Sequence, residues 1–517
     1  MTKVLLLTPL LQHNAWEDDI NTKWPPLGLL YIASSLEKAG HQCKLVERRR
    51  IIKEHPRSPA NLKTTDDQMM AEIKAFAPDV IAVSAMTFHI MDAYRACKRI
   101  KEELPQVEIV IGGSHPTAVP ERTLKECPAI DYVVKGEGEE VMLEFCDGTT
   151  PREKIEGLYF RREGAPDGIH FTGIREVVDN ITSLPWPALH LVDREFYFAP
   201  SSQLFRGYYL RGTTMFTSRG CPFKCAFCQS PQISVSNSGK FVRSRDAQEV
   251  VAEVKHLIAT YGVEGIYFSD DVFTVHRARV EELCKAFIES GINQKIVWCC
   301  NVRVDLVDDK LLSLMKTAGC VKMLFGIESG SDDSLVRLNK GGQANARRNI
   351  ETIKKVQAHG IGCETGIILG LPDDTEEDIL ATMRMLEECK PARVNRGKLY
   401  PIPGTQYYNE LLAKGKVDPN IPWDQIYTHY TRSDFTFAAM PAHKFRKLAA
   451  KFDRRVTMPT NYKFMIKSNW KRHPNVAIRQ FFLMIAHVTV LYFPIGFQDW
   501  LRATVEKFRF KSKYVFE

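Results

Sequence analysis

The sequence predicts an α/β protein that begins with a doubly wound parallel sheet, continues into a second alternating unit and ends in a basic helical region. Short apolar runs alternate with segments of helical periodicity over roughly the first 140 residues, and the alternation resumes near residue 214. After about residue 430 the pattern changes to basic helices. With 517 residues, of which 44% are hydrophobic, the chain can build several domains with cores of their own.

The N-terminal sheet is expected to contain five strands joined by helices. Each strand is a short and almost uninterrupted apolar run, as in parallel strands that are covered on both faces. The strands are expected at 4–8, 44–47, 80–84, 107–111 and 132–134, with helices at 27–39 and 92–103. Such sheets bind ligands at the carboxyl ends of their strands.

Four of these strand exits carry glycine, proline or small hydroxyl residues. Glycine lets the backbone approach a bulky ligand and hydroxyl groups can hydrogen-bond it, although a single Gly-Gly after a strand is usually only a turn. The candidate ligand contacts are Pro26, Leu27, Gly28, Ser84, Thr87, Gly112, Gly113, His115, Thr117, Gly136, Glu137 and Gly138.

Three cysteines with the spacing CxxxCxxC, Cys221, Cys225 and Cys228, form the most specific motif of the chain. Three thiolates this close in sequence can ligate three irons of a 4Fe-4S cluster and leave the fourth iron without a protein ligand. A structural zinc site and ordinary buried thiols are the alternatives. Zinc normally takes a fourth Cys or His at short spacing, and the histidines that follow, His256 and His276, are isolated. The motif therefore favours a cluster with an open iron.

The sequence around these cysteines, including the aromatic Phe227 before the third one, resembles the radical S-adenosylmethionine (radical SAM) family. The resemblance implies that the open iron chelates the amino and carboxylate groups of SAM. An electron from the cluster would then cleave SAM to a 5′-deoxyadenosyl radical. The family also implies a partial (β/α)6 barrel after the proline-punctuated linker at 181–187. Within that barrel, the spacing Asp246-x-x-Glu249 predicts a capping box for a helix that ends at Gly262.

Positions that match the SAM contacts of the family fall at the ends of the expected barrel strands. The resemblance implies that the stretch at 269–271 holds the methionyl amine, that Arg303 grips the carboxylate, and that Glu328 binds other polar groups. Residues 366–373 would pack against adenine. The implied SAM contacts are Phe227, Ser269, Asp270, Asp271, Arg303, Glu328, Gly366 and Ile368.

Residues 1–145 resemble the cobalamin-binding domain of cobalamin-dependent radical SAM enzymes, because the four strand exits occur in this order upstream of the cysteine motif. The candidate ligand contacts at these exits would then hold cobalamin. No Asp-x-His-x-x-Gly motif occurs, so a histidine ligand to cobalt from that motif is not expected. A vestigial domain without the cofactor is the alternative. The expected domains are a cobalamin domain at 1–180, a linker at 181–210, a radical SAM domain at 211–430 and a basic helical region at 431–517.

The remaining cysteines indicate a reducing compartment. Thirteen cysteines are scattered without a regular framework and residues 1–10 lack the pattern of a secretory signal, so a cytoplasmic protein is expected. Cys299 and Cys300 close an apolar strand without a CxxC partner. Ordinary buried thiols are therefore favoured there over an auxiliary cluster.

The C-terminal region carries the net positive charge. Residues 441–517 contain 16 Lys and Arg against four acidic residues, and the apolar run at 481–497 lies among them. At 17 residues this run only reaches the lower limit for a spanning helix. A peripheral segment at the inner face of the membrane and the core of a small domain are equally compatible with it. Nucleic-acid binding is not expected, because no RNA-binding module accompanies the charge.

The combined resemblance implies a carbon methyltransferase that uses a 5′-deoxyadenosyl radical and methylcobalamin on an unactivated carbon. A non-methylating enzyme with the same cofactors, such as an oxidative cyclase, is one alternative. A non-catalytic corrinoid- or membrane-binding module with a relict cluster is another. The substrate would be a small or lipid-like molecule and the electron donor a flavodoxin or ferredoxin, while no general acid or base can be assigned.

Overall fold

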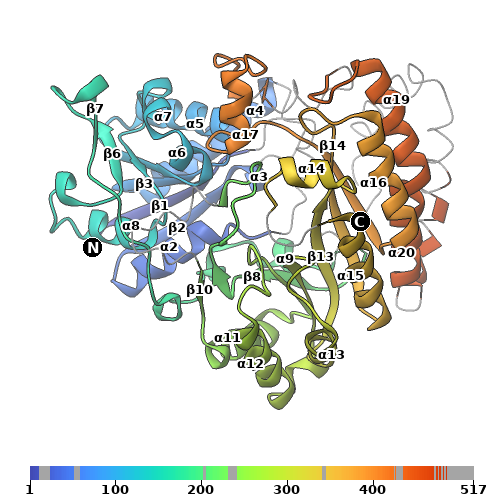
Figure 1. Ribbon diagram of the computed structural model, residues 1–517. Helices are drawn as coiled ribbons and strands as arrows, with labels where there is room; N and C mark the ends of the chain where they lie inside the picture. Colours follow the sequence, from blue (N-terminus) through green and yellow to red (C-terminus); the bar gives the residue numbers. More distant parts are fainter. Residues whose placement is uncertain are drawn as a thin grey trace.

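Figure 1 shows the computed structural model, in which the N-terminal sheet lies beside a barrel and the C-terminal helices run along the far side of that barrel. The structure describes residues 1–10, 24–51, 59–201, 205, 207–230, 242–340, 345–423, 425–426, 435–470 and short stretches between 473 and 485.

The N-terminal sheet has seven strands in the order β2-β1-β3-β4-β5-β6-β7, of which the first five run parallel. They are β1 (Lys3–Thr8), β2 (Gln42–Glu47), β3 (Val80–Ser84), β4 (Glu108–Gly112), β5 (Tyr132–Val134), β6 (Leu158–Arg161) and β7 (Ile169–Phe171). The five parallel strands confirm the predicted ones to within two residues. The antiparallel extension by β6 and β7 was not predicted.

Helices cover both faces of this sheet because successive strand residues point to opposite sides. They are α2 (Leu27–Lys38), α3 (Arg48–Ile51), α4 (Pro59–Phe76), α5 (Ile90–Glu103), α6 (Ser114–Ala118), α7 (Pro120–Glu126) and α8 (Glu139–Asp147). Leu5 and Leu7 of β1 pack with α4 and α5 on one face. Val4 packs with α2 and α8 on the other. The predicted doubly wound arrangement is confirmed.

The second unit is an open barrel of six parallel strands in the order β15-β14-β13-β12-β11-β8. The strands are β8 (Gly212–Met215), β11 (Gly265–Phe268), β12 (Val297–Val302), β13 (Cys320–Glu328), β14 (Gly362–Leu369) and β15 (Arg393–Lys398). Outside them lie α11 (Ala247–Tyr261), α12 (Arg277–Glu289), α13 (Asp309–Thr317), α15 (Ala346–Ala358) and α16 (Glu376–Cys389). The partial barrel of six strands is confirmed.

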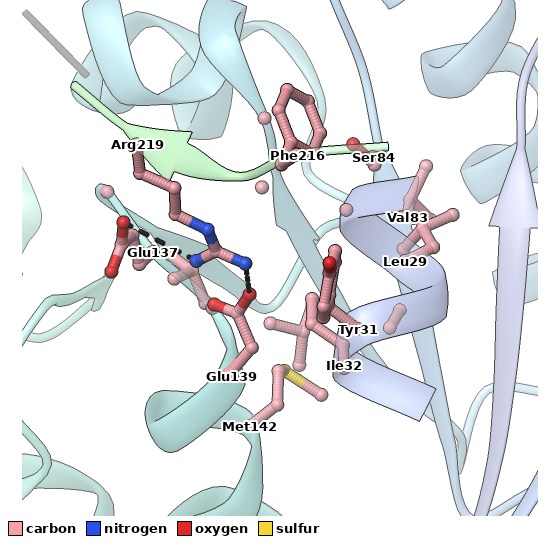
Figure 2. Close-up of a pocket in the computed structure, with 18 of the residues that line it drawn as sticks. Leu29, Tyr31, Ile32, Val83, Ser84, Glu137, Glu139, Met142, Phe216 and Arg219 are labelled. Carbon is pink, nitrogen blue, oxygen red and sulfur yellow. Dashed lines mark hydrogen bonds and ion pairs between the residues drawn. The ribbon is translucent and has the colours of Figure 1, made fainter. Parts of the chain in front are cut away.

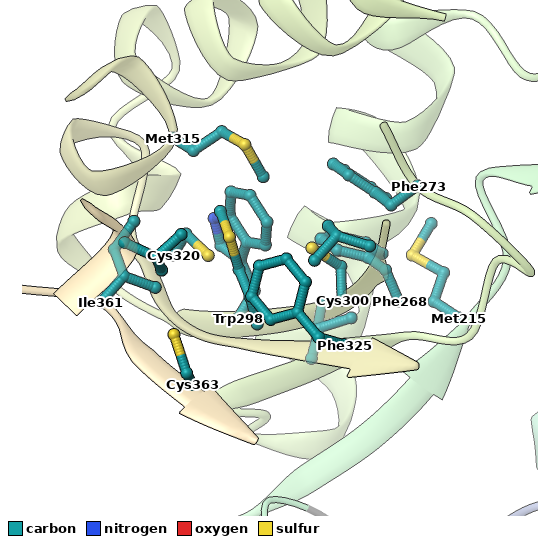
Figure 3. Packing of buried hydrophobic residues seen from close by; sticks show 14 of the residues in the cluster. Met215, Phe268, Phe273, Trp298, Cys300, Met315, Cys320, Phe325, Ile361 and Cys363 are labelled. Carbon is teal, nitrogen blue, oxygen red and sulfur yellow. The ribbon is translucent and has the colours of Figure 1, made fainter. Parts of the chain in front are cut away.

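The core between the barrel strands and these helices is aromatic and rich in sulfur (Figure 3). Trp298 packs with Met315 and Phe325, and its indole Nε1 donates a hydrogen bond to the Ala318 carbonyl oxygen at 2.8 Å. Cys300 is fully buried in this core, and burial raises the pKa of its thiol well above the ordinary value. Its neighbour Cys299 faces the interior of the barrel instead, since successive strand residues alternate.

Helix α11 begins after Asp246 and ends before Gly262 as predicted, but the capping box does not form. Asp246 makes no side-chain cap hydrogen bond. The Glu249 carboxylate accepts hydrogen bonds from both Arg245, with Nε to Oε2 at 2.7 Å, and the Trp186 indole. A guanidinium is a stronger partner for a carboxylate than a neutral backbone N–H. The helix limits are therefore right and the predicted cap is wrong.

The described part of the basic C-terminal region belongs largely to the barrel. Helix α19 (Ala442–Phe452), a π-helical turn (Asp453–Thr457) and α20 (Met458–Asn469) pack along the edge strand β15 and helix α16. Phe445 and Phe452 are buried in the barrel core. The predicted run at 481–497 lies almost wholly outside the described residues. Among the helices that the structure does describe, none combines the length and apolar character needed to span a bilayer.

Candidate functional site

The cysteine loop follows β9 (Ser218–Arg219), which pairs with β10 (Arg243–Ser244) in a two-stranded antiparallel ribbon, and the structure describes residues 220–230 and 242 of this loop. Its centre is anchored by the buried Ala226, whose backbone N–H donates to the Leu338 carbonyl at 2.9 Å. The Ala226 carbonyl in turn accepts from the backbone N–H of Tyr407 at 2.9 Å. These bonds fix the backbone between Cys225 and Cys228 at the mouth of the barrel.

A cavity of about 400 Å³, here called the barrel cavity, lies beneath this loop. Cys221, Cys225 and Cys228 line it together with residues at the carboxyl ends and on the inner face of the strands. Active sites of barrels form at this end of the strands, where loops from several strands meet.

The donor set fits a 4Fe-4S cluster. Burial raises the pKa of the Cys221 thiol to about 11. Burial also raises the pKa of Cys225, although the nearby charges of Lys340 and Arg303 oppose the shift and favour a thiolate. Among the described residues, no three Cys, His, Asp or Glu side chains are arranged to hold one metal ion. A cubane takes each thiolate on a different iron, so its protein ligands need not converge on a single point.

Five of the eight implied SAM contacts line the barrel cavity with the cysteines. These five are Phe227, Asp271, Arg303, Glu328 and Gly366. They come from the cysteine loop, from the carboxyl ends of β11, β12 and β13, and, for Gly366, from the middle of β14. The fold therefore brings together residues that are up to 145 positions apart in the chain, as Cys221 and Gly366 are.

The other three lie outside this lining. Ser269 follows β11 and its backbone N–H donates to the Met215 carbonyl at 2.9 Å. Ile368 packs against an apolar cluster that joins the barrel to the N-terminal sheet. Asp270 is fully buried and accepts a hydrogen bond from the Thr217 backbone at 2.7 Å and one from the Ser218 hydroxyl at 2.6 Å. Because its oxygens are used in this way, Asp270 supports the turn before the cysteine loop.

Glu328 has an unusual backbone conformation, with φ at 66°, where β13 ends in a register shift against β14. Such a conformation is uncommon outside glycine and often marks a functional position. Burial raises the pKa of Glu328, while the ammonium of Lys340, 3.4 Å from Oε1, opposes the shift. A Cβ at Gly326 would lie 2.5 Å from the same oxygen, so glycine at 326 makes room for this carboxylate.

Arg303 is held rigidly in the wall of the barrel cavity. Its Nε and Nη2 donate to the two oxygens of Asp305 at 3.0 and 3.1 Å, and Nη1 donates to the Lys340 carbonyl at 2.8 Å. The guanidinium lies 3.7 Å from the ring centroid of Phe223. This support fixes a positive charge beside the cysteines.

The floor of the barrel cavity is polar, which the sequence did not indicate. Lys322 and Glu364 form an ion pair at 3.0 Å with side chains only 1% and 2% exposed. Nearby, the Tyr267 hydroxyl donates to Asn301 Oδ1 at 2.8 Å. From the sequence alone, charged residues within strands would be placed at the surface. Lys322 and Glu364 are buried because the barrel closes around them.

A second cavity of about 310 Å³, here called the sheet cavity, lies between the N-terminal sheet and β9 (Figure 2). Its depth is apolar and is formed by side chains such as Leu29, Ile32, Val83 and Met142. Seven of the twelve candidate contacts at the strand exits line it, namely Gly28, Ser84, Gly112, Gly113, Gly136, Glu137 and Gly138.

The remaining five candidates, Pro26, Leu27, Thr87, His115 and Thr117, support the exits from behind rather than line the cavity. His115 is fully buried against Trp423, with ring centroids 4.7 Å apart, and its Nδ1 lies 3.1 Å from the Thr87 hydroxyl. The Thr117 hydroxyl accepts a hydrogen bond from the Gly136 backbone at 3.2 Å. Pro26 and Leu27 begin α2. Strand exits therefore identify the neighbourhood of a ligand but not which side chains turn toward it.

The sheet cavity combines an open rim, made largely of glycine backbone, with an apolar depth. A Cβ at Gly28 or at Gly136 would meet nothing within 4 Å, so both glycines leave space open. Gly113 has φ at 102°, and a Cβ there would lie 2.7 Å from the Ala85 carbonyl, so the β4 exit requires glycine. The backbone groups of this rim can hydrogen-bond amides such as those around a corrin ring, so the residues present fit cobalamin.

The sequence analysis did not identify Arg219 and Glu139 as site residues. They lie on opposite sides of the sheet cavity, Arg219 on β9 and Glu139 at the start of α8, and bind each other. The Arg219 side chain extends from β9 toward Glu137 and Glu139, with Nη2 2.6 Å from Glu139 Oε1 (Figure 2). The available signal was position alone. Arg219 stands two residues before Cys221, and Glu139 closes the last of the four strand-exit motifs.

The two cavities meet at Ser230 and Asp271, which line both. The Ser230 hydroxyl donates to Asp271 Oδ1 at 3.0 Å. Burial raises the pKa of Asp271, and the hydrogen bond from Ser230 opposes that shift. A molecule at this junction can therefore reach the contents of both cavities.

Comparisons with known proteins agree with this two-cavity arrangement. The B12 binding domain family matches residues 18–145, and the radical SAM superfamily matches residues 215–386. An uncharacterized methyltransferase of Pyrococcus horikoshii is 30% identical over 411 residues, which cover 80% of this chain and 83% of that protein. The anaerobic magnesium-protoporphyrin IX monomethyl ester cyclase of Rubrivivax gelatinosus is 28% identical, covering 80% of this chain and 71% of its own.

Solved structures share the fold. The radical SAM methyltransferase TsrM from Kitasatospora setae superposes with a TM-score of 0.63 at 18% identity, covering 80% of this chain and 76% of its own. The cobalamin-dependent radical SAM enzyme OxsB gives 0.62 at 16% identity, with coverages of 95% and 72%. Both family domains, the cysteine motif at the barrel mouth and the relative in Pyrococcus horikoshii lead to one conclusion: the chain belongs to the cobalamin-dependent radical SAM enzymes.

Proposed function

We propose that the protein is a methyltransferase that adds a methyl group to an unactivated carbon. The observation that carries this proposal is the junction at Ser230 and Asp271, which line both the sheet cavity and the barrel cavity. A substrate carbon at that junction faces a radical source on one side and a methyl carrier on the other. Relatives named as methyltransferases, including the cytidylyl-2-hydroxyethylphosphonate methyltransferase of Streptomyces wedmorensis at 27% identity, support the same reaction class.

The residues of the barrel cavity would hold the cluster and SAM. Cys221, Cys225 and Cys228 would bind three irons, and the bound cluster and cobalamin supply one-electron cleavage of SAM and transfer of a methyl group. The fixed charge of Arg303 suits the SAM carboxylate, while Glu328 can accept hydrogen bonds from its amine or ribose. Phe227 and Gly366 would shape the space around the cosubstrate.

The residues of the sheet cavity would hold cobalamin. Gly28 and Gly136 leave room at the rim, which Gly112, Gly113 and Gly138 also line, and the depth of the cavity is apolar. Ser84 and Glu137 offer hydrogen-bonding groups to corrin amides. Because no Asp-x-His-x-x-Gly motif occurs in the sequence, this site would hold cobalamin without a histidine from that motif.

Analysis of the reaction products tests this proposal. Reconstituted protein is given a reductant, cobalamin, SAM with a trideuterated methyl group and a small-molecule extract of the source cells. A methyltransferase releases S-adenosylhomocysteine together with 5′-deoxyadenosine and yields a product that carries the deuterated methyl. If 5′-deoxyadenosine and a product form without any S-adenosylhomocysteine, methyl transfer is excluded.

An oxidative ring closure without methyl transfer is the second candidate, since two relatives named as magnesium-protoporphyrin IX monomethyl ester cyclases are 28% and 27% identical. That reaction requires no S-adenosylhomocysteine, so the same experiment distinguishes the two. Magnesium-protoporphyrin IX monomethyl ester is the direct probe for it.

We also propose three finer properties. The polar floor formed by Lys322, Glu364 and Asn301 favours a small substrate with hydrogen-bonding groups over a pure hydrocarbon. Electrons would come from a flavodoxin or ferredoxin, because cleavage of SAM consumes one from the cluster. The C-terminal charge supports a cytoplasmic protein that associates with the inner face of the membrane.

A further inference from the structure

The ribbon of β9 and β10, here called the neck of the cysteine loop, carries two arginines opposite each other. In the ribbon of β9 and β10, Arg219 pairs directly with Arg243, so both side chains stand on the same face. Two like charges placed opposite each other repel unless an anion lies between them. Arg219 is two residues before Cys221, so the position of this neck bears directly on the first cysteine.

The anion between the arginines comes from the other domain. Glu137, at the exit of β5, receives Arg243 through two bonds, Nη1 to Oε2 at 2.9 Å and Nη2 to Oε1 at 2.6 Å. Arg219 Nη1 lies 3.4 Å from the same Oε1, and its Nη2 is 2.6 Å from Glu139. Arg243 also donates to the Val178 carbonyl at 2.6 Å, so the segment just before the linker is bound to the ribbon as well.

These groups are shielded from water. The Arg243 and Glu139 side chains are 3% and 5% exposed, and Arg219 and Glu137 are 18% and 16% exposed. Burial alone raises the pKa of Glu137, but the hydrogen bond from Arg243 and the two positive charges outweigh it and lower the pKa below the ordinary value. Glu137 therefore stays charged at neutral pH.

The same side chains line the sheet cavity. Glu137, Glu139 and Arg219 are part of its wall, with Arg219 also facing the ring of Tyr31 at 5.1 Å (Figure 2). A molecule that fills the cavity touches groups whose ion pairs set the position of the cysteine loop. Buried ion pairs seldom add net stability relative to apolar packing, and their better-attested role is to fix one arrangement among several.

We propose that Glu137, Glu139, Arg219 and Arg243 form a latch through which occupancy of the sheet cavity and binding of SAM at the cysteine loop affect each other. Arg219 and Arg243 are positioning residues that act through the backbone of the loop. The proposal rests on the proposed cofactor sites and adds a thermodynamic coupling between them. Such coupling is reciprocal, so each ligand must change the affinity of the other by the same factor.

The test measures hydroxocobalamin affinity with and without SAM, in protein whose cluster is kept oxidised so that SAM is not cleaved. In the wild type we expect SAM to change the Kd of hydroxocobalamin by about 5-fold or more. In Arg243→Gln and in Glu137→Gln this factor should fall to about one. The double variant should resemble either single variant, because both remove the same pair.

Glu140→Gln is the matched control. Glu140 follows Glu139 on α8, but its carboxylate binds Arg175 at 3.2 Å and is half exposed. This variant should keep the wild-type coupling factor. Iron content and far-UV circular dichroism check that each variant is folded and loaded. The absorption spectrum of bound hydroxocobalamin, recorded with the cluster oxidised, is a second readout: its change on adding SAM is expected in the wild type and Glu140→Gln and absent in both latch variants.

The outcomes separate the two levels of the proposal. If the wild type binds hydroxocobalamin and SAM without mutual influence, or if the latch variants keep the coupling factor, the four residues are a structural interface only and the latch is excluded. If the wild type fails to bind hydroxocobalamin at all, the proposed cobalamin site is wrong, and the latch is excluded as well because it depends on that site.

Discussion

Gly28 is the residue at which the sheet cavity can be filled with least disturbance to the fold. It lies in helix α2 with an ordinary helical backbone, and a Cβ there would meet nothing within 4 Å. We predict that Gly28→Leu abolishes or strongly reduces stoichiometric cobalamin binding, because the side chain would occupy ligand space. The free energy of unfolding should not fall, since glycine costs a helix about 0.5–1 kcal/mol relative to alanine.

Absorption spectroscopy after anaerobic loading measures the bound cobalamin in this variant. Gly40→Ala is a less suitable control because Gly40 has φ at 89°. Glu37→Gln is the better control, since Glu37 is nine positions after Gly28 in α2 and therefore lies on the opposite side of the same helix. Full cobalamin binding by Gly28→Leu would place the ligand outside the sheet cavity.

Cys225 is the cysteine nearest to the cationic groups of the barrel cavity. We predict that Cys225→Ala lowers the iron content from about four per chain and removes SAM cleavage, because three thiolates are the minimum set for a cluster with one open iron. Iron analysis and chromatography of 5′-deoxyadenosine measure the two effects. Cys43→Ala, on strand β2, should retain both properties. Formation of 5′-deoxyadenosine by a triple variant of Cys221, Cys225 and Cys228 would contradict the assignment.

His115 should make the stability of the N-terminal domain depend on pH. Burial, with a smaller contribution from the charge of Arg122, lowers its pKa to about 3 from the ordinary value of 6.5. Below pH 6.5 the unfolded chain binds the proton and the folded one does not. Folding therefore loses up to about 1.4 kcal/mol per pH unit from this group as the pH falls from 6.5 toward 3.

Thermal unfolding between pH 7 and 5 measures this effect. We predict a shallower pH dependence for His115→Phe than for the wild type. Because His115 lies outside the lining of the sheet cavity, His115→Phe should also retain cobalamin binding. An unchanged slope would mean that His115 is protonated through another partner or is hydrated.

At the scale of single residues, the sequence predicted which side chains can bind a ligand better than it predicted where those side chains point. The three cysteines were predicted from spacing, since chemistry dictates three close thiolates for a cluster with an open iron. Asp270 and Asp271 are adjacent and chemically identical, yet one is buried under the turn and the other faces both cavities. That choice depends on Thr217 and Ser218, which lie more than 50 positions away in the chain.

At the scale of secondary-structure elements, helix α20 protects the open edge of the barrel. Asn461 Oδ1 accepts the Val394 backbone N–H and its Nδ2 donates to the Val394 carbonyl, both at 2.8 Å. Its side-chain amide therefore takes the place of a neighbouring strand on β15. We predict that Asn461→Ala costs about 1–3 kcal/mol, because two backbone groups lose their partner.

Chemical unfolding followed by circular dichroism measures this loss. The exposed Lys463→Ala on the same helix should change stability by less than about 0.5 kcal/mol. Equal stability of Asn461→Ala and Lys463→Ala would show that water satisfies the edge of β15.

Elements with a strong hydrophobic period were predicted well, and those defined by distant contacts were not. The five parallel strands of the N-terminal sheet follow from apolar runs bounded by turn residues. β6 and β7 were missed because such short antiparallel strands with partly polar residues resemble loops in sequence. Helices α19 and α20 were predicted only as part of a basic helical region, because basic residues recur along both of them. The burial of Phe445 and Phe452 depends on the barrel helices against which they pack.

At the scale of the whole molecule, the C-terminal region should bring the enzyme to anionic membranes. Ile478, Phe481 and Phe482 are 45%, 44% and 64% exposed at helical spacing. We predict reversible binding to vesicles that contain phosphatidylserine, with about 1 kcal/mol from each basic residue near the surface. Binding should weaken as salt rises, because screening acts within about 10 Å at 0.1 M.

Vesicle sedimentation at two salt concentrations measures this binding. The chain is truncated after Asn469, so that α19 and α20 are kept. Removing these two helices would expose the barrel core. The protein truncated after Asn469 should keep its cluster and cobalamin and lose vesicle binding. Failure of the full-length protein to bind anionic vesicles would remove the only support for a lipid-like substrate.

The ribbon at the neck of the cysteine loop also has a consequence for how the enzyme acquires its iron. A free chain of roughly 20 residues pays about 3 kcal/mol of entropy to bring its ends together. Hydrogen bonds between β9 and β10 hold those ends together through protein contacts alone. Iron and sulfide therefore meet Cys221 in a chain whose loop ends are joined by the ribbon, and cluster assembly does not have to supply this part of the closure entropy.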